Sequence, residues 1–300
     1  MKASKALTLS LGELNMPVIT EYQVGLALHK IYRQKEYKGE SVALQKDAAE
    51  RRDFNKYLLN LIEDGVLNKH SDLPPKVFAF VGHLRWAPEE VVCAADPFSY
   101  ISHLSAMAYH GLTDRIPVKL YVSSPGPTEW KKFAQERMEK DLGANLDEYT
   151  SNGLPLLTRS NFLKIGKTEI HSFKSKHLGA YKNAHERAIR VSTMGRTFLD
   201  MLRSPELCGG INHVLEVYDE YAEKYLRLIT DEINTHGAPI DKVRAGYIIS
   251  ERLNIKNDVV ESWIEYAQRG GSRKLDATGE YIPEWSDRWC LSINIFEKAK

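Results

Sequence analysis

The stretch IRVSTMGRTFLDMLRSPELCGGI, residues 189–211, contains a strand end, a helix and a turn in that order. Ser192 or Thr193 can cap the helix, because a side-chain hydroxyl at that position accepts a backbone N–H that the first turn leaves unpaired. Apolar residues then recur at helical spacing, and Gly209 and Gly210 supply a turn before the next helix. A strand that leads directly into a capped helix predicts a domain that mixes strands and helices.

A second stretch, residues 97–112, ends in SAMAYHGL. Its apolar spacing predicts a helix over residues 97–111, and Gly111 can take the left-handed conformation that ends a helix. Both stretches resemble the C-terminal domain of AbiEi-type antitoxins, the antitoxin half of an abortive-infection (type IV) toxin–antitoxin pair. The matching residues are Ser102, His110, Gly111, Leu112, Ser192, Thr193, Arg196, Thr197, Leu199, Asp200, Pro205, Glu206, Leu207, Gly209 and Gly210.

The resemblance continues toward the C-terminus. Arg244 belongs to a segment that looks like the family's Arg-x-Gly-Tyr helix, and residues 271–276 and 289–294 look like its closing segments. One departure is Ala245, which stands where family members often have Leu. The residues that carry the antitoxin-domain motif are therefore Ser102, His110, Gly111, Arg196, Thr197, Asp200, Gly209, Gly210 and Arg244.

This family implies a function and two partners. Its members repress their own operon through an N-terminal winged helix, so one expected partner is double-stranded operator DNA. The other is a nucleotidyltransferase-like toxin, although neutralisation in the family need not involve a stable complex. The resemblance leaves the oligomeric state open, and a monomer that binds repeated sites is one arrangement.

The first 87 residues have a pattern that fits this expectation. Thr20 and Gln23 form a capping box at the start of a helix. The apolar piece 42–44 is expected to begin a second helix, and Asp47 to cap a third that runs to about residue 64. Two short strands over residues 66–69 and 77–81 then predict a hairpin. Helix, helix, helix, hairpin is the order of a winged helix-turn-helix.

The third predicted helix carries basic residues near its start, on the side opposite the apolar stripe of Phe54, Leu58 and Leu61. Side chains there can meet phosphates and base edges when a helix enters a major groove. The alternative interpretation is that these basic residues form an ordinary solvent-exposed helix face. The expected DNA contacts are Lys46, Arg51, Arg52, Asn55, Lys56, Lys69 and Lys76.

Residues 88–300 predict a larger mixed α/β domain with a helical C-terminal part, which makes the whole chain α+β with two domains, 1–87 and 88–300. Alternation predicts a hairpin formed by 162–165 and 168–171. Further strands are expected at 118–122, 188–191 and 286–295, and helices at 128–140, 194–202, 211–235, 239–253 and 259–268.

Composition narrows the class of protein. The net charge is +1, and the longest apolar runs fall well short of the roughly 20 residues that cross a bilayer. The three cysteines, Cys93, Cys208 and Cys290, are far apart and show no metal-ligand spacing. We expect reduced thiols in a cytoplasmic protein without a membrane partner.

The sequence predicts that the protein is not an enzyme, because no motif places a nucleophile or a metal-binding cluster together with a base. We expect no cofactor, no metal and no catalytic residue, and a surface ion pair between Arg196 and Asp200 at helical spacing. Two alternatives stay open: a DNA-binding defence regulator without a toxin partner, or a metal-dependent nuclease built on Glu169. A basic, histidine-rich stretch is either solvated surface or a loop that faces an anion or nucleic acid; it holds His171, Lys174, Lys176, His177, Lys182, His185 and Arg187.

Overall fold

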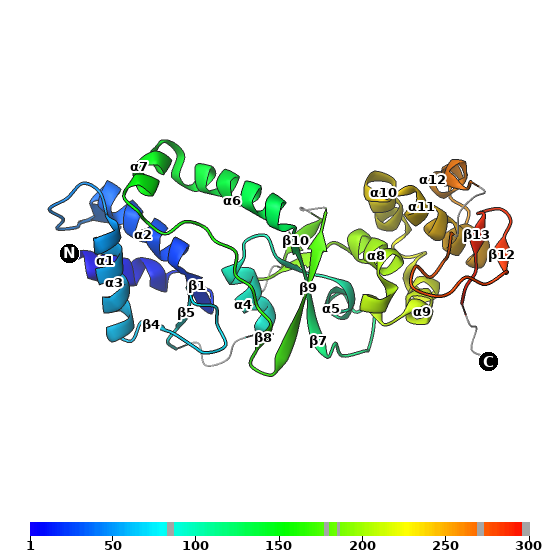
Figure 1. Ribbon diagram of the computed structural model, residues 1–300, viewed down its shortest axis with the longest axis horizontal. Helices are drawn as coiled ribbons and strands as arrows, with labels where there is room; N and C mark the ends of the chain where they lie inside the picture. The colour runs from blue at the N-terminus through cyan, green and yellow to red at the C-terminus, as the bar shows by residue number, and fades with distance from the viewer. Residues whose placement is uncertain (83–86, 177–179, 185–186, 269–272, 296–300) are drawn as a thin grey trace.

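The computed structural model describes residues 1–82, 87–176, 180–184, 187–268 and 273–295, and its fold is α+β. The elements follow one another along an elongated molecule, with the N-terminal helices at one end and the C-terminal helices at the other (Figure 1). A six-stranded sheet lies between these two helical ends. Three hydrophobic clusters accompany this arrangement: one around the N-terminal helices, one shared by the small N-terminal sheet and the central sheet, and one among the C-terminal helices.

The N-terminal unit, residues 1–82, combines three helices with a small antiparallel sheet. Its sheet has the strand order β1-β5-β4, so β5 lies in the middle. Apolar side chains of all three helices meet in one cluster. The elements are α1 (Ala3–Gly12), β1 (Val18–Thr20), α2 (Glu21–Gln34), α3 (Arg51–Glu63), β4 (Leu67–Asn68) and β5 (Val77–Phe80).

Two predictions for this unit were wrong. Residues 42–44 form no helix; they follow a hairpin of β2 (Glu36–Tyr37) and β3 (Glu40–Ser41), and the first of the three helices is α1 instead. Asp47 does not cap α3, because its carboxylate pairs with Lys35 and the N-cap is Glu50. The capping box of Thr20 and Gln23 at the start of α2 is confirmed.

The central sheet has the strand order β10-β11-β6-β7-β9-β8. Its longest pairing is parallel, between β7 and β9, and aligns Tyr121 with His171 and Ser123 with Phe173. The predicted hairpin of β8 and β9 is confirmed. The strands are β6 (Tyr100–Ile101), β7 (Lys119–Pro125), β8 (Lys164–Ile165), β9 (Thr168–Ser175), β10 (Tyr181–Asn183) and β11 (Arg190–Ser192).

The helix predicted over residues 97–111 is shorter than expected. Its first part is strand β6, and α5 covers only His103–Tyr109, because the backbone of residues 100–101 pairs with β7 and β11. A helix not predicted from the sequence, α4 (Pro88–Ala95), packs its valines on one face of the sheet, against Ile101, Leu120 and Val122.

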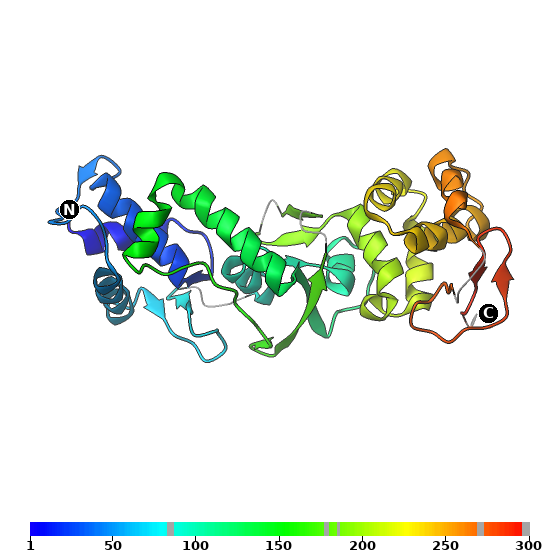
Figure 2. The same cartoon turned by 45° about the horizontal axis from the view of Figure 1, so that its top comes forward.

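Two helices return from the central sheet to the N-terminal unit. Figures 1 and 2 show α6 (Pro127–Leu142) running back toward α2, with α7 (Leu146–Ser151) beyond it. Trp130, Met138 and Tyr149 are buried in the same hydrophobic cluster as α1, α2 and α3. The N-terminal core is therefore built from two separate pieces of sequence.

The C-terminal part is helical. The helix predicted over 211–235 is broken into α9 and α10, which are separated by a turn at 222–225. The residues predicted as one closing strand form two short strands joined by a turn. The elements are α8 (Met194–Arg203), α9 (Ile211–Tyr221), α10 (Leu226–His236), α11 (Pro239–Gly246), α12 (Asp258–Ser262), β12 (Trp285–Ser286) and β13 (Leu291–Ser292).

Candidate functional site

One side of α3 is exposed. Phe54 and Leu61 are buried against the N-terminal core, whereas Arg52, Asn55 and Lys56 are exposed. This division follows from helical periodicity, since residues four apart share a face. We call these three exposed residues the α3 face; beside them lies the exposed side chain of Leu59.

Two basic side chains at the start of α3 are exposed but already have partners within the chain. Lys46 Nζ lies 3.1 Å from Glu50 and 3.3 Å from Asp53, so two carboxylates neutralise it. The backbone N–H of Arg51 donates to the carbonyl of Asn152 at 3.0 Å, and its guanidinium lies over the ring of Phe54. Lys46 and Arg51 are therefore engaged within the chain, unlike the α3 face.

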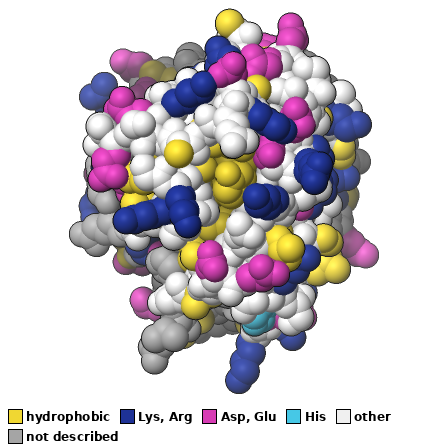
Figure 3. All heavy atoms as spheres, turned by 90° about the vertical axis from the view of Figure 1, so that its left-hand side faces the viewer, with side chains coloured by type: hydrophobic (Ala, Val, Ile, Leu, Met, Phe, Trp, Pro, Cys, Tyr) yellow, Lys and Arg dark blue, Asp and Glu magenta, His cyan; other side chains and the backbone are white. Residues whose placement is uncertain are grey.

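Lys69 and Lys76 follow β4 and precede β5, and both are exposed. Figure 3 looks at the N-terminal end of the molecule and shows Lys and Arg side chains spread around exposed hydrophobic atoms, with acidic groups between them. The positive charge at this end is dispersed. A nucleic-acid contact here would therefore use individual side chains rather than one dense basic patch.

The motif residues of α8 form a buried polar cluster. Arg196 Nε donates to Asp200 Oδ1 at 2.7 Å, and both side chains are almost fully buried. The predicted surface pair is therefore wrong, because α5 and α10 pack on α8 and Arg196 Nη2 lies 3.5 Å from Ser175 Oγ on β9. Thr193 caps α8, and Thr197 donates to its carbonyl.

Two serine hydroxyl groups lead to a buried histidine. Ser123 Oγ donates to Ser102 Oγ at 2.8 Å, and Ser102 Oγ lies 2.8 Å from His103 Nδ1. His103 has φ +50°, a backbone conformation that non-glycine residues rarely adopt. Burial lowers the pKa of His103 below its ordinary value. The ring is therefore neutral at pH 7.

Several atoms of this cluster make no hydrogen bond to the described residues. They are Arg196 Nη1, Asp200 Oδ2 and His103 Nε2. Buried polar groups almost always have partners, so unpaired ones mark a place for water or a ligand. The charges of Arg196 and Asp200 also act on the pKa of His103, which places the three groups in one electrostatic environment.

The remaining motif residues hold the fold together at other places. His110 Nε2 lies 2.8 Å from the carbonyl of Ser192. Gly111, Gly209 and Gly210 all have positive φ, at +67°, +90° and +91°. Arg244 donates to the carbonyls of Lys274 and Leu202 from the far side of α8. The structure thus brings Thr197, Arg196 and Asp200 together on α8 and ties His110 to the Ser192 carbonyl just before that helix, whereas Ser102 bonds to His103 and Ser123.

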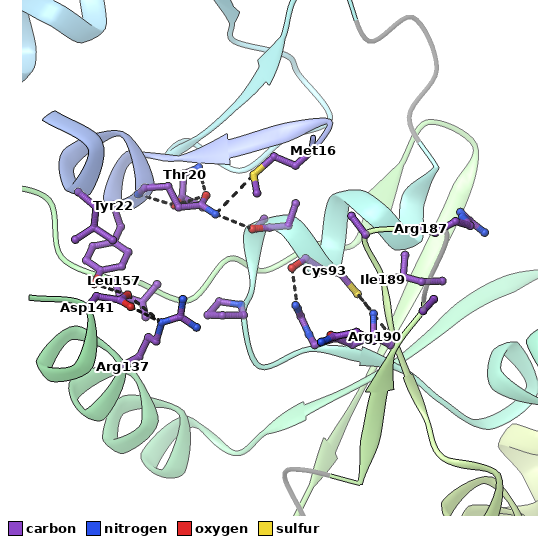
Figure 4. Close-up of a pocket in the computed structure, with 18 residues that line it drawn as sticks. Met16, Thr20, Tyr22, Cys93, Arg137, Asp141, Leu157, Arg187, Ile189 and Arg190 are labelled. Carbon is purple, nitrogen blue, oxygen red and sulfur yellow. Dashed lines mark hydrogen bonds and ion pairs between the residues drawn. The ribbon is translucent and has the colours of Figure 1, made fainter. Parts of the chain in front are cut away.

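A pocket of about 380 Å³ lies between the N-terminal unit and the central sheet (Figure 4). Its arginines are already engaged: Arg137 pairs with Asp141, and Arg190 donates to the carbonyl of Cys93. Tyr22 reaches across to Asp141 at 3.1 Å. The pocket was not predicted, because its walls come from segments far apart in the chain.

The residues of the alternative nuclease site, Glu169, Lys174 and Lys176, are separate from the buried cluster of Arg196 and Asp200. Glu169 pairs with Lys119 at 2.9 Å on the sheet, and Lys174 and Lys176 are exposed. Within the described ranges, no group of three or more His, Cys, Asp or Glu side chains comes together as metal ligands would. His177 and His185 lie outside the described residues.

No helix among the described residues is long and apolar enough to cross a membrane. No family model and no curated protein matches the chain. A solved structure, the crystal structure of RV2827C protein from Mycobacterium tuberculosis, aligns with 96% of this chain and 90% of that one at 12% identity and a TM-score of 0.43. That likeness is too distant to assign a fold or a function to this chain.

Proposed function

We propose that the chain is a DNA-binding regulator whose N-terminal unit is a winged helix that binds operator DNA through α3. The observation that carries this proposal is the order of the elements: α1, β1, α2, α3, β4 and β5, with the sheet β1-β5-β4 beside three packed helices. This is the order expected of a winged helix, in which the third helix enters the major groove and the β4–β5 loop is the wing.

The chemistry of the α3 face fits this role. Arg52 can bind a guanine edge or a phosphate, Asn55 can pair with an adenine edge, and Lys56 can bind a phosphate. Lys69 and Lys76 flank the wing and are placed for the backbone of the neighbouring groove. Lys46 and Arg51 contribute less, since Glu50, Asp53 and Phe54 already hold them.

The antitoxin role rests on the resemblance of residues 97–112 and 189–211 to AbiEi-type antitoxins. In this proposal the chain represses its own operon and counteracts a nucleotidyltransferase-like toxin. The buried ion pair of Arg196 and Asp200 then shapes the antitoxin domain from within and does not touch a partner.

The test compares two double variants in binding to a duplex of the chain's own promoter region. Arg52→Ala with Lys56→Ala should weaken binding, and each lost phosphate contact should lower the slope of log K against log salt by about 0.9. Arg227→Ala with Lys256→Ala removes two exposed positive charges from the C-terminal part and is the matched control. Equal binding of the two variants at two salt concentrations would exclude α3 from the interface.

Co-expression with the toxin tests neutralisation of the toxin separately from repression of the operon. The variant that lacks Arg52 and Lys56 should still rescue growth, since the motif residues, from Ser102 to Arg244, all lie outside the N-terminal unit. Loss of rescue together with loss of repression, in a variant that remains folded, would show that the α3 face also serves neutralisation.

A further inference from the structure

The loop between β4 and β5 is attached to the central sheet. The carboxylate of Asp72, in the middle of this loop, accepts a hydrogen bond from the backbone N–H of Gly166 at 3.0 Å. Gly166 lies in the two-residue turn between β8 and β9. Figures 1 and 2 show the loop and the turn side by side along the lower side of the molecule. The hydrogen bond therefore joins two segments that are 94 residues apart in the chain.

The next residue of the loop is buried at the same place. Leu73 is only 8% exposed and belongs to the hydrophobic cluster that includes Phe162 and Ile165, just before and within β8. The same cluster contains Val77 of β5 and the valines of α4, so it extends from the small N-terminal sheet to the central sheet. Burial of a leucine side chain holds such a contact more strongly than one exposed hydrogen bond. Leu73 therefore faces the central sheet and not a partner.

Three lysines surround this attachment. Lys69 and Lys76 flank the loop, and Lys167 follows Gly166 in the β8–β9 turn. All three are exposed, and none of them forms an ion pair with a residue of the described ranges. We call residues 69–76 together with the turn 166–167 the joint wing. Its two pieces come from the N-terminal unit and from the central sheet.

Lys164 belongs to the same hairpin but points to its other side. Its neighbour Ile165 is buried in the cluster that contains Leu73, and consecutive residues of a strand point to opposite faces. Lys164 is also the register partner of Glu169, which pairs with Lys119. Lys164 is therefore an exposed lysine outside the joint wing, and it offers a matched control.

We propose that the joint wing binds the phosphate backbone of the operator DNA, with Lys167 contributed by the central sheet. This inference rests on the proposed function, in which α3 enters the major groove and the wing lies over the neighbouring backbone. Asp72 is a positioning residue, because its bond to Gly166 holds the loop and the turn together. Lysines that are held in place before binding lose less conformational freedom when they meet phosphates.

The salt dependence of duplex binding tests Lys167. Fluorescence anisotropy of a labelled duplex from the chain's own promoter region gives the binding constant at several salt concentrations. Lys167→Ala should lower the slope of log K against log salt by about 0.9, the value for one lost phosphate contact. Lys164→Ala removes the same charge from the other side of the hairpin and should leave the slope unchanged. Equal slopes for the two variants would overturn the inference.

Two substitutions of Asp72 test the attachment. Asp72→Asn and Asp72→Ala both remove a negative charge that repels DNA, but only asparagine keeps a side-chain oxygen that accepts from Gly166. Asp72→Ala should therefore bind the duplex more weakly than Asp72→Asn, by about tenfold at most, the factor that corresponds to one hydrogen bond. Binding by Asp72→Ala as tight as that of Asp72→Asn would contradict the positioning role.

Chemical protection of the wild-type protein tests the surface without any substitution. Acetylation of lysines with acetic anhydride, followed by mass spectrometry, should show that the duplex protects Lys69, Lys76 and Lys167 but not Lys164. A Lys167 that reacts equally with and without the duplex would overturn the inference, even where a variant fails to fold.

The outcomes separate this inference from the proposed function. A wild-type protein that binds no duplex would overturn the proposed function and the inference together. Weaker binding by Arg52→Ala with Lys56→Ala, combined with an unchanged salt slope for Lys167→Ala, would overturn the inference alone and confine the DNA contact to the N-terminal unit.

Discussion

Arg196 Nε and Asp200 Oδ1 lie 2.7 Å apart on α8, and each side chain is only 3% exposed. Removing one member of such a buried pair leaves the other as an uncompensated charge, which is far costlier than the loss of an exposed pair. The pair also lies between the sheet, where Arg196 reaches Ser175, and α10. It thereby couples the position of α8 to both neighbours.

Asp200→Ala should therefore destabilise the protein strongly. We expect the free energy of unfolding to fall by about 3–5 kcal/mol in urea denaturation, because Arg196 stays buried without its partner. Asp231→Ala is the matched control, since Asp231 pairs with Arg227 at the same i, i+4 spacing on an exposed surface. The control should change stability by less than about 1 kcal/mol. Equal losses in the two variants would contradict the buried role.

Gly195→Ala should disturb the packing of α8 on α10. A Cβ atom at Gly195 would lie 2.2 Å from the carbonyl oxygen of Leu228, so one helix backbone must move. Overpacking of this kind costs about 1–3 kcal/mol. Gly12→Ala is the control, because that helical glycine has no atom within 4 Å of the added group. Thermal unfolding should show a lower Tm for Gly195→Ala and an unchanged Tm for Gly12→Ala. A Tm of Gly195→Ala equal to that of the wild type would contradict the close contact between α8 and α10.

A fragment of residues 88–300 should expose apolar surface. Trp130, Met138 and Tyr149 pack into the N-terminal cluster, so removal of residues 1–87 uncovers them. We expect stronger fluorescence of a hydrophobic dye and self-association in sedimentation, relative to the full chain. A monomeric fragment that unfolds as cooperatively as the full chain would instead support a domain boundary at residue 87.

Acid should destabilise the N-terminal unit through His29. Both ring nitrogens of His29 lack a partner among the described residues, and burial lowers its pKa below the ordinary 6.5. The unfolded chain then binds the proton more readily than the folded chain. The stabilising contribution is complete above about pH 6.5 and is lost as the pH falls toward the lowered value.

His29→Phe should keep the packing on Tyr149, whose ring lies 5.4 Å from that of His29, and remove the titration. The loss of unfolding free energy between pH 7 and pH 5 should then be smaller than in the wild type. Identical profiles for the wild type and His29→Phe would rule out this histidine as the cause.

Local signals in the sequence determined many of the elements. The Thr20–Gln23 capping box, the strand that includes Leu120 and the hairpin at Gly166 depend on neighbouring residues, so their spacing alone predicts them. The exposed side of α3 was also predictable, because helical periodicity separates Arg52 and Lys56 from Phe54.

Only the tertiary structure decided which of these residues are buried and which meet. Arg196 and Asp200 have the spacing of a surface pair, and no local signal shows that elements distant in the sequence bury them. Lys46 is basic in the sequence, but Glu50 and Asp53 neutralise it. The rings of Tyr121 and His171 meet because a parallel pairing aligns β7 with β9 across some fifty residues of chain. Burial and register depend on contacts between distant segments, and these are absent from any local window of sequence.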